Sequence, residues 1–324
     1  MEVIEELIKD KDAKKFCNES HSWKNEHLVI AKPYGQIFRE GYVANFHQKI
    51  QNVTCYEDDV WITSHPKSGT RWTQEIVWCL KNNMDLEKAL STNLNVRIPM
   101  LCDDFFANDY VDPQVSSFEF VKNMERPRIV HTHLMYDMLP RDLLEKKIKM
   151  IYVIRNPRDV IISYLNHLRI LHGYEGDLQT LLDLFLKDLG PHWGPYFKHV
   201  LSYWNKKSEL PNLLITRYEE MQADLPKVIK RIASFLEVTI SDEDVLKLCD
   251  HVSFEKMKAN PMVNKDESFE ERKKAMNNGY AGKFINKGKS GTWKEYLTDE
   301  MVQRFEQWEE KWLKDTDLKF VYEV

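Results

Sequence analysis

Four short apolar runs punctuate the chain, at residues 60–63, 128–131, 150–154 and 213–216. Segments with helical character lie between and after them, at residues 72–81, 157–171, 224–236, 241–250 and 298–313. Strands that are apolar along nearly their whole length and that alternate with helices indicate a parallel sheet covered on both faces. We therefore expect an α/β fold in which helices flank a central, mainly parallel sheet.

The chain shows no internal repeat and no linker rich in serine, glycine or proline. Its 324 residues include only 11 glycines and 12 prolines, and 43% of them are hydrophobic, which is enough to close a large core. We expect one domain over residues 1–324, with about the first 20 residues at its periphery.

The charge balance excludes one class of partner. The chain has 46 Lys and Arg against 51 Asp and Glu, a net charge of −5 and a pI near 6.2, so we expect no nucleic-acid partner. The first ten residues lack the apolar core of a secretory signal, and no uncharged apolar run reaches the roughly 18 residues of a membrane span. These features predict a cytoplasmic protein with no membrane partner. Reduced thiols are expected at Cys17, Cys55, Cys79, Cys102 and Cys249, which form no C-x-x-C pair.

The first apolar run leads into a glycine-containing turn that opens a helix, with the sequence HPKSGTRW at residues 65–72. Such a turn directs backbone N–H groups and a helix N-terminus at one point, and Lys67, Ser68 and Thr70 add a charge and hydroxyl donors. The G-x-x-x-x-G-K-[ST] spacing of the nucleoside-triphosphate loop is absent. The turn is either an anion cradle or an ordinary polar loop.

Arg155 directly follows the third run, and Ser163 lies one to two turns into the next helix. A guanidinium fork and a hydroxyl could grip a second phosphate. Alternatively, Arg155 and Arg158 pair with Asp159 and neighbouring acids. Ligands of parallel sheets bind at the carboxyl ends of the strands, so two anion sites at adjacent strand ends favour a nucleotide with separated phosphates.

The second run ends at His131, and His133 follows two positions later, so the two side chains would share one face of an extended strand. Three interpretations stay open: a metal pair, a general base, and a hydrogen-bonded histidine that closes the strand. The metal pair lacks a carboxylate or thiolate at ligand spacing, whereas the intrinsic pKa of imidazole suits a base.

A basic segment lies near the C-terminus. Residues 283–294 hold four lysines and two glycines. This composition suits either a loop that closes over phosphates or a solvated surface turn.

Taken in order, these segments resemble the cytosolic sulfotransferases, which transfer a sulfonate group from 3′-phosphoadenosine 5′-phosphosulfate (PAPS) to a hydroxyl or amine. The resemblance runs from about Tyr56 to Lys314, and an invertebrate member is one candidate. The motifs that carry it are PKSGTxW at 66–72, THL at 132–134, RNPRDVxxS at 155–163, RYEEM at 217–221, SFEKM at 253–257 and KGxxGxWK at 287–294.

The resemblance implies how PAPS would be held. The 5′-phosphosulfate would lie on the turn from Lys67 to Thr70, and the adenine between Trp72 and Phe254 near Tyr218. The 3′-phosphate would contact Arg155, Ser163 and Lys287 with Gly288. The full set of implied cofactor-binding residues is Lys67, Ser68, Gly69, Thr70, Arg71, Trp72, Arg155, Ser163, Tyr218, Ser253, Phe254, Asn286, Lys287 and Gly288.

The resemblance also assigns the chemistry. His133 would take the proton of the acceptor, and Lys67 would stabilise charge on the leaving phosphate. No metal is implied, because a sulfonate carries less charge than a transferring phosphoryl group, and the missing Mg²⁺ ligands count against a kinase.

Four positions depart from the family pattern. His131 stands where many members have lysine, Arg71 replaces a threonine and Asn286 replaces an arginine. We expect an altered rate or pH dependence from the first, a substitute charge from the second and a weaker 3′-phosphate grip from the third. The fourth departure is in the dimer segment, K-x-x-x-T-V-x-x-x-E, which at residues 294–303 has lost its apolar residue and its acid, so a homodimer stays open.

The acceptor is expected to be a small, largely apolar alcohol, phenol or amine. Its pocket should be formed by residues 94–110, 172–196 and 268–282, with Met100, His133 and His167 as substrate-binding residues. Two other functions stay open. One is net dehydration through a sulfonated intermediate, as in an insect retinol enzyme of this family. The other is nucleotide binding without catalysis.

Overall fold

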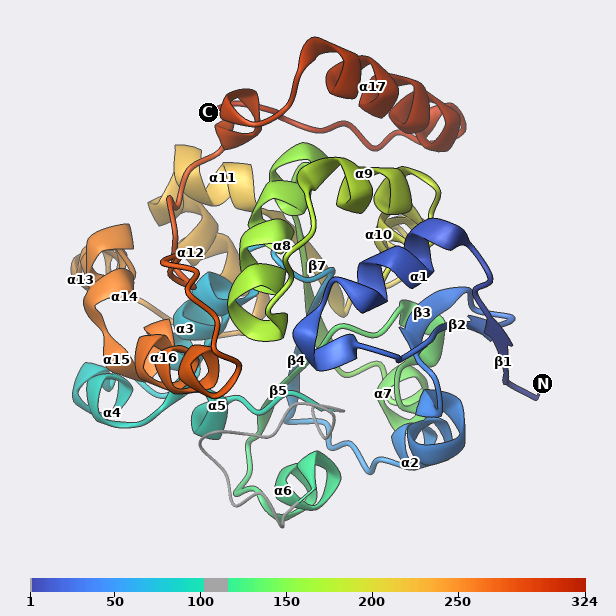
Figure 1. Ribbon diagram of the computed structural model, residues 1–324. Coiled ribbons are helices and arrows are strands. Elements are labelled where there is room, and N and C mark those ends of the chain that lie inside the picture. Colours follow the sequence, from blue (N-terminus) through green and yellow to red (C-terminus); the bar gives the residue numbers. More distant parts are fainter. Residues whose placement is uncertain (1, 102–115) are drawn as a thin grey trace.

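The computed structural model describes residues 2–101 and 116–324. Its centre is a four-stranded sheet with the strand order β5-β4-β6-β7, and all of its pairings are parallel (Figure 1). Its strands are β4 (Val60–Ser64), β5 (Ile129–Thr132), β6 (Lys149–Ile154) and β7 (Leu213–Arg217). The expected α/β fold with a central parallel sheet is confirmed, and each strand boundary lies within one residue of its predicted place.

The two faces of this sheet belong to two separate apolar clusters. Along β4, Val60 and Ile62 are buried in one cluster while Trp61 is buried in the other, and Ile151 and Tyr152 alternate in the same way on β6. This is the two-residue period of a strand. Helices cover both faces, which explains why the sequence of these strands is apolar without a break.

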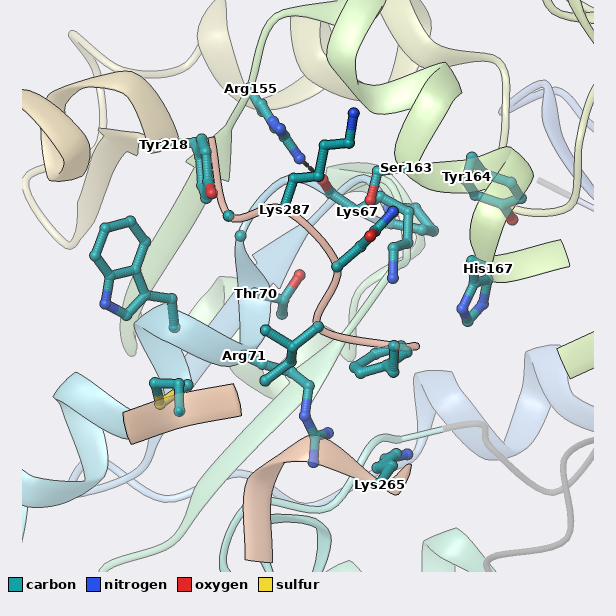
Figure 2. A pocket seen from close by; sticks show the side chains of 18 of the residues that line it. Lys67, Thr70, Arg71, Arg155, Ser163, Tyr164, His167, Tyr218, Lys265 and Lys287 are labelled. Atoms are coloured by element: carbon teal, nitrogen blue, oxygen red, sulfur yellow. Dashed lines mark hydrogen bonds between the residues drawn. The ribbon is translucent and has the colours of Figure 1, made fainter. Parts of the chain in front are cut away.

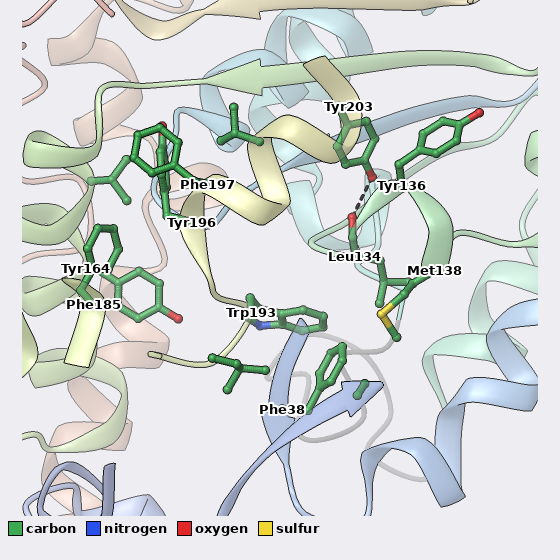
Figure 3. Close-up of a cluster of buried hydrophobic side chains, with 14 of the residues drawn as sticks. Phe38, Leu134, Tyr136, Met138, Tyr164, Phe185, Trp193, Tyr196, Phe197 and Tyr203 are labelled. Atoms are coloured by element: carbon green, nitrogen blue, oxygen red, sulfur yellow. Dashed lines mark hydrogen bonds between the residues drawn. The ribbon is translucent and has the colours of Figure 1, made fainter. Parts of the chain in front are cut away.

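Aromatic side chains dominate the cluster on the Trp61 face. Figure 3 shows Phe197, Tyr196, Trp193 and Phe38 in this layer, together with Tyr203, whose hydroxyl donates a 2.7 Å hydrogen bond to the carbonyl of Leu134. A buried tyrosine hydroxyl usually finds such a partner. The bond ties the helix that carries Tyr203 to the segment that follows β5.

The helices expected from the sequence form with side-chain caps. Asn156, Asp224, Ser241 and Thr298 each accept a hydrogen bond from a backbone N–H in the first turn of their helices, as N-cap residues do. The predicted helices are observed as α3 (Thr70–Lys81), α8 (Pro157–His172), α12 (Leu225–Phe235), α13 (Asp242–His251) and α17 (Asp299–Leu313).

Shorter helices complete the layers. They are α1 (Lys11–Asn18), α2 (Gln48–Gln51), α4 (Leu86–Ser91), α5 (Leu94–Arg97), α6 (Ser117–Asn123), α7 (Arg141–Glu145), α9 (Leu178–Leu186), α10 (Tyr196–Trp204), α11 (Tyr218–Ala223), α14 (Phe254–Ala259), α15 (Pro261–Asn264) and α16 (Asp266–Ala275). The described part of the chain has no helix with the length and apolarity needed to cross a membrane.

A second, antiparallel sheet near the N-terminus was not predicted. It has the order β1-β2-β3, with β1 (Ile4–Leu7), β2 (Leu28–Lys32) and β3 (Gln36–Arg39). The strands β1 and β3 mix polar with apolar residues and give no apolar run, whereas β2 contains the apolar run at residues 28–31, which was not predicted as a strand. The helix α1 follows β1 and buries Ala13, Phe16 and Cys17 in the core.

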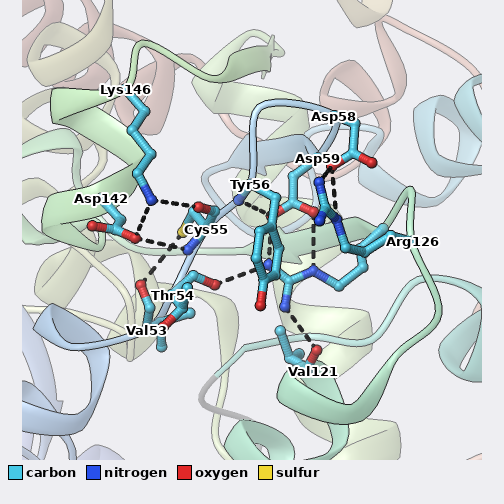
Figure 4. Close-up of polar contacts among 11 residues, drawn as sticks. Val53, Thr54, Cys55, Tyr56, Asp58, Asp59, Val121, Arg126, Asp142 and Lys146 are labelled. Atoms are coloured by element: carbon cyan, nitrogen blue, oxygen red, sulfur yellow. Dashed lines mark hydrogen bonds and ion pairs between the residues drawn. The ribbon is translucent and has the colours of Figure 1, made fainter.

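A buried ion pair joins the amino ends of β4 and β5, at the edge of the sheet opposite the carboxyl ends. Arg128 donates from Nε and Nη2 to the two carboxylate oxygens of Asp59, at 2.9 and 2.5 Å, and both residues are 1% exposed. The guanidinium also donates to the carbonyls of Val121 and Thr54, at 3.0 and 2.9 Å. Figure 4 shows Asp59 in this network beside the neighbouring Arg126 and Asp58. Four hydrogen bonds from the Arg128 guanidinium thus connect it to Asp59 and to neighbouring carbonyl groups.

Candidate active site

A cavity of about 550 Å³ is lined by residues that end or directly follow β4, β5, β6 and β7 (Figure 2). This is the sheet edge at which ligands of parallel α/β folds bind. The sequence-predicted residues on its wall are Lys67, Gly69, Thr70, Arg71, Trp72, Met100, His133, Arg155, Ser163, His167, Tyr218, Phe254, Asn286, Lys287 and Gly288. Two predicted residues, Ser68 and Ser253, are not on the wall.

The turn between β4 and α3 has a backbone that only certain residues tolerate. Lys67 has φ 69° and Gly69 has φ 105°, both in the left-handed region. A Cβ on Gly69 would lie 2.8 Å from a ring carbon of Tyr218, so the turn and the aromatic side chain can meet only at a glycine. The Ser68 hydroxyl is buried and has no hydrogen-bond partner among the described residues. The turn therefore holds a buried donor without a partner among the described residues, next to the wall residues Lys67 and Gly69.

His133 is fixed in one tautomer. Its Nδ1 lies 2.7 Å from the carbonyl oxygen of Ser64, and because a carbonyl only accepts, Nδ1 carries the proton and Nε2 keeps its lone pair. Burial lowers the pKa of His133 to about 4; the bond to Ser64 raises it in part, and the charge of Lys67 lowers it further. The imidazole is therefore neutral near pH 7 and able to accept a proton.

His131 lies beside His133, with 6.0 Å between the ring centroids, and both side chains line the cavity. The Nδ1 of His131 lies 3.2 Å from the carbonyl oxygen of Ile98. Burial and the neighbouring His133 lower the pKa of His131 well below its ordinary value. The expected shared face is observed, and each imidazole is held by a backbone carbonyl.

Lys67 is crowded by other cations. Burial lowers its pKa to about 7, and the charges of Arg155, Arg71 and Lys265 act in the same direction. Its Nζ lies 4.0 Å from the ring centroid of Phe284. Because neighbouring positive charges disfavour its protonated form, Lys67 is poised to gain a proton when an anion arrives.

Arg155 is held in the wall by carbonyl groups and an aromatic ring. Its guanidinium donates to the carbonyls of Lys67 at 3.4 Å and Lys289 at 2.9 Å, and its Cζ lies 4.2 Å from the ring centroid of Tyr218. Asp159 is 3.9 Å away. Arg155 thus bridges the first turn, the C-terminal loop and the end of β7.

Arg158 faces away from the cavity. Its Nη2 donates to Glu309 of α17 at 2.8 Å, and its Cζ lies 4.3 Å from the ring centroid of Tyr322. The alternative of an acid partner therefore holds for Arg158, although that partner is distant in sequence.

Asp159 anchors the C-terminal basic segment. Its carboxylate accepts hydrogen bonds from the backbone N–H of Gly291 at 2.8 Å, the hydroxyl of Thr292 at 2.9 Å and the N–H of Trp293 at 3.0 Å. A carboxylate that accepts several donors fixes the segment that supplies them. The segment is consequently held as a loop over the cavity, with Lys287 and Gly288 on the wall.

Arg71 makes contacts beyond the turn. Its Nε donates to the carbonyl of Val263 and its Nη1 to the side chain of Asn95, both at 2.9 Å. Its guanidinium carbon also lies 5.6 Å from the ring centroid of Phe284. The guanidinium thus lies between α15, α5 and the C-terminal loop.

The expected acceptor loops contribute His172, His192, Trp193, Phe269 and Arg272 to the wall. Residues 102–110 of the first expected loop lie outside the described residues. Sequence reasoning missed Trp23, Lys265 and Phe284, which also line the cavity. Trp23 packs on His172 with 4.4 Å between ring centroids, a contact between distant segments that no local pattern signals.

One cluster of candidate metal-ligating side chains exists among the described residues, formed by Glu75, Cys79 and His251. The Glu75 carboxylate already bonds Nε2 of His251 and Nη2 of Arg97, at 2.8 Å in both cases. None of these residues lines the cavity. We read the cluster as a buried polar network that joins α3 to α13.

Comparison with known proteins places the chain among sulfotransferases. The model of the family described as "Sulfotransferase domain" matches residues 57–317. A luciferin sulfotransferase of Photinus pyralis is 33% identical, with 91% of this chain and 80% of that protein covered. Sulfotransferase 1B1 of Mus musculus is 34% identical, with 93% and 97% covered.

Two solved structures of related enzymes superpose on this chain. A retinol dehydratase in complex with retinol and PAP, the desulfonated product of PAPS, superposes with a TM-score of 0.86 at 28% identity, with 99% of each chain covered. Mouse sulfotransferase SULT7A1 complexed with PAP gives a TM-score of 0.67 at 26% identity, with 90% of this chain and 96% of that chain covered.

Proposed function

Because this chain belongs to the sulfotransferase domain family and is a PAPS-dependent sulfotransferase, we propose that it sulfonates the hydroxyl or amine of a small, largely apolar acceptor with His133 as the general base. The observation that carries this proposal is the pairing of His133 with Lys67 on one cavity wall. The imidazole is neutral, its proton is committed to the Ser64 carbonyl and its Nε2 is free to accept. The positive charge of Lys67 acts on His133 and can stabilise negative charge on a bound ligand.

The residues present fit PAPS. Lys67 and Arg155 follow the ends of β4 and β6, and Lys287 of the C-terminal loop also lies on the cavity wall, so the wall carries the cations that an anionic nucleotide requires. The Ser68 hydroxyl and the Trp72 indole N–H are buried with no partner among the described residues, and buried donors are normally satisfied. An aromatic pair, Trp72 and Tyr218, lies with ring centroids 5.6 Å apart and offers a surface to a base.

Each residue then has a defined task. When bound, PAPS supplies the sulfonate group. His133 would accept the proton of the acceptor through Nε2, and its bond to Ser64 would hold the ring in place during the transfer. Lys67 would neutralise charge that develops on the leaving oxygen, inside a wall where charge interactions are stronger than in water. Arg155, Ser163 and Lys287 would hold the 3′-phosphate.

The test is direct binding followed by transfer. Calorimetry should detect uptake of PAP by the purified protein, and labelled PAPS should sulfonate members of a panel of phenols, steroids, retinoids and amines. Failure to bind PAP at millimolar concentration would overturn the proposal, whatever the panel shows.

Proton uptake should accompany PAP binding above neutral pH. Lys67 has a pKa of about 7 in the free site, so at pH 8 it is mostly neutral, and a bound anion should restore its charge. Calorimetry in buffers with different ionisation enthalpies should give an uptake approaching about one proton per PAP at pH 8. Lys67→Met should abolish this uptake and weaken PAP binding. Identical apparent enthalpies in all buffers would contradict the predicted role of Lys67.

One comparison favours a second candidate. The retinol dehydratase superposes with a higher TM-score, 0.86, than the mouse sulfotransferase, 0.67. A retinol-like acceptor could therefore lose sulfate after sulfonation and give net dehydration. Mass spectrometry of a reaction with retinol and PAPS separates a sulfonated product from one that has lost water. A non-catalytic protein would bind PAP and give neither product.

A further inference from the structure

The backbone that carries His133 is held by side chains from two other elements. The carbonyl oxygen of His133 accepts two hydrogen bonds, from Nε2 of Gln36 at 2.7 Å and from Nε2 of His199 at 2.9 Å. A carbonyl oxygen has two lone pairs, so both of its acceptor positions are used. The imidazole is held separately, through the bond from Nδ1 to the carbonyl of Ser64. The proposed base is therefore fixed at both its main chain and its side chain.

Gln36 reaches this backbone from β3 in the N-terminal sheet. Its side chain is buried, and its amide is shared by three backbone groups. Besides the bond to His133, Nε2 donates to the carbonyl of Trp193 at 3.3 Å, and Oε1 accepts from the N–H of Met135 at 2.9 Å. An amide nitrogen has two N–H donors, so both carbonyls can be served at once. Because Trp193 lines the cavity, one side chain ties the proposed base to the cavity wall.

The contact between Gln36 and Trp193 is part of a longer pairing. The N–H of Trp193 donates to the carbonyl of Ile37 at 2.9 Å, and the N–H of Ile37 donates to the carbonyl of Gly194 at 2.8 Å. The ring centroid of Trp193 lies 5.9 Å from that of the His133 imidazole. The strand β3 therefore holds the wall residue and the proposed base in one hydrogen-bonded unit.

His199 acts on the same carbonyl from the helix α10, where it is buried. Because the carbonyl of His133 only accepts, Nε2 of His199 carries the proton and Nδ1 keeps its lone pair. The hydroxyl of Tyr152 in β6, which lies 2.8 Å from Nδ1, is then the donor to that lone pair. Burial lowers the pKa of His199 to about 3, so the ring is neutral near pH 7. Tyr152 thus favours the tautomer of His199 that donates to His133.

From these contacts we infer that Gln36 and His199 are positioning residues for His133: their hydrogen bonds to its carbonyl hold the imidazole Nε2 where the acceptor meets it. The inference rests on the proposed function, since it assigns a task to residues behind the proposed base. Neither Gln36 nor His199 lines the cavity, so their effect on transfer passes through another residue. A displacement of a catalytic group by about 1 Å can lower a rate about 10²-fold.

The first test replaces Gln36 by methionine, which has a similar length but no N–H donor. Gln36→Met should lower kcat by about 10- to 100-fold and leave the affinity for PAP unchanged. The measurements are single-turnover transfer from labelled PAPS to the best acceptor of the panel, and calorimetry with PAP. Gln51→Met is the matched control. Gln51 of α2 donates to the carbonyls of Met138 and Leu139, at 3.2 and 3.0 Å, farther along the segment after β5, so its loss should leave kcat unchanged.

The variants His199→Leu and His199→Gln separate hydrogen-bond donation from packing. Glutamine can place an amide N–H near the position of Nε2 and still donate to the carbonyl of His133, whereas leucine cannot. We expect His199→Gln to keep most of kcat and His199→Leu to lose about as much as Gln36→Met. This pair tests the inference even where Gln36→Met gives no folded protein.

The last test repeats the first substitution without the base. In the His133→Ala background, Gln36→Met should cause no further loss, because a positioning residue acts only through the residue that it positions. Three results would overturn the inference: full kcat in Gln36→Met, a loss that persists undiminished in the His133→Ala background, or equal losses in the two His199 variants. Failure of the proposed function looks different, since PAP would then not bind or His133→Ala would transfer at the full rate.

Discussion

His133→Ala should reduce kcat for sulfonate transfer by about 10²- to 10⁴-fold while PAP binds as before. The imidazole donates through Nδ1 to Ser64 and presents Nε2 to the cavity, so alanine removes the only proposed proton acceptor without removing a proposed nucleotide contact. The measurements are single-turnover transfer from labelled PAPS and calorimetry with PAP.

His133→Asn provides the matched comparison. Asparagine places an amide N–H near the position of Nδ1 and can still donate to the Ser64 carbonyl, but it has no basic nitrogen, so it should be about as slow as alanine if proton transfer is the role of His133. An asparagine variant with nearly full kcat would show that the residue only shapes the site. A simultaneous loss of PAP affinity would point instead to a disturbed fold.

Arg128→Leu should lower the free energy of unfolding by about 3–5 kcal/mol, since it leaves the buried carboxylate of Asp59 without its partner. The pair is 1% exposed at both residues and uses four hydrogen bonds from one guanidinium. Urea denaturation of the purified variants gives the measurement. Activity of the folded fraction should be kept, because the pair lies at the opposite edge of the sheet from the cavity.

Arg126→Leu is the control for this substitution. Arg126 is only two positions from Arg128 and pairs with Asp58. The side chains of this pair are 49% and 42% exposed, and exposed ion pairs contribute little to stability. The double variant Arg128→Leu with Asp59→Leu should recover part of the lost stability, because no charge is then left buried. If Arg126→Leu and Arg128→Leu lowered the free energy of unfolding equally, burial would not be the reason for the effect of Arg128→Leu.

The sequence was sufficient for the parallel sheet because β4 to β7 are buried on both faces and therefore read as apolar runs. The same reasoning fails for β1, whose sequence Ile-Glu-Glu-Leu is largely exposed, and for short helices fixed by packing more than by periodicity. The spacing of apolar residues in a sequence reflects which residues are buried, so elements that are mostly exposed show no clear spacing.

The strand-end positions of the site were predictable for a related reason. Lys67, His133 and Arg155 lie within four positions after apolar runs, and the topology of a parallel sheet brings such positions together. Lys265 and Trp23 could not be found in this way. Lys265 is placed by its own left-handed backbone conformation between α15 and α16. Trp23 is placed by a ring contact with His172, which is 149 positions away in the sequence.

The hydrogen bonds to Asp159 have a consequence for the timing of catalysis. Gly291, Thr292 and Trp293 all bond to this one carboxylate, so displacing the C-terminal loop would break these bonds as a group. If PAP leaves by that side, its release requires these hydrogen bonds to break. Asp159 would then affect the rate of product release, although it lies outside the cavity wall and has no role in the transfer itself.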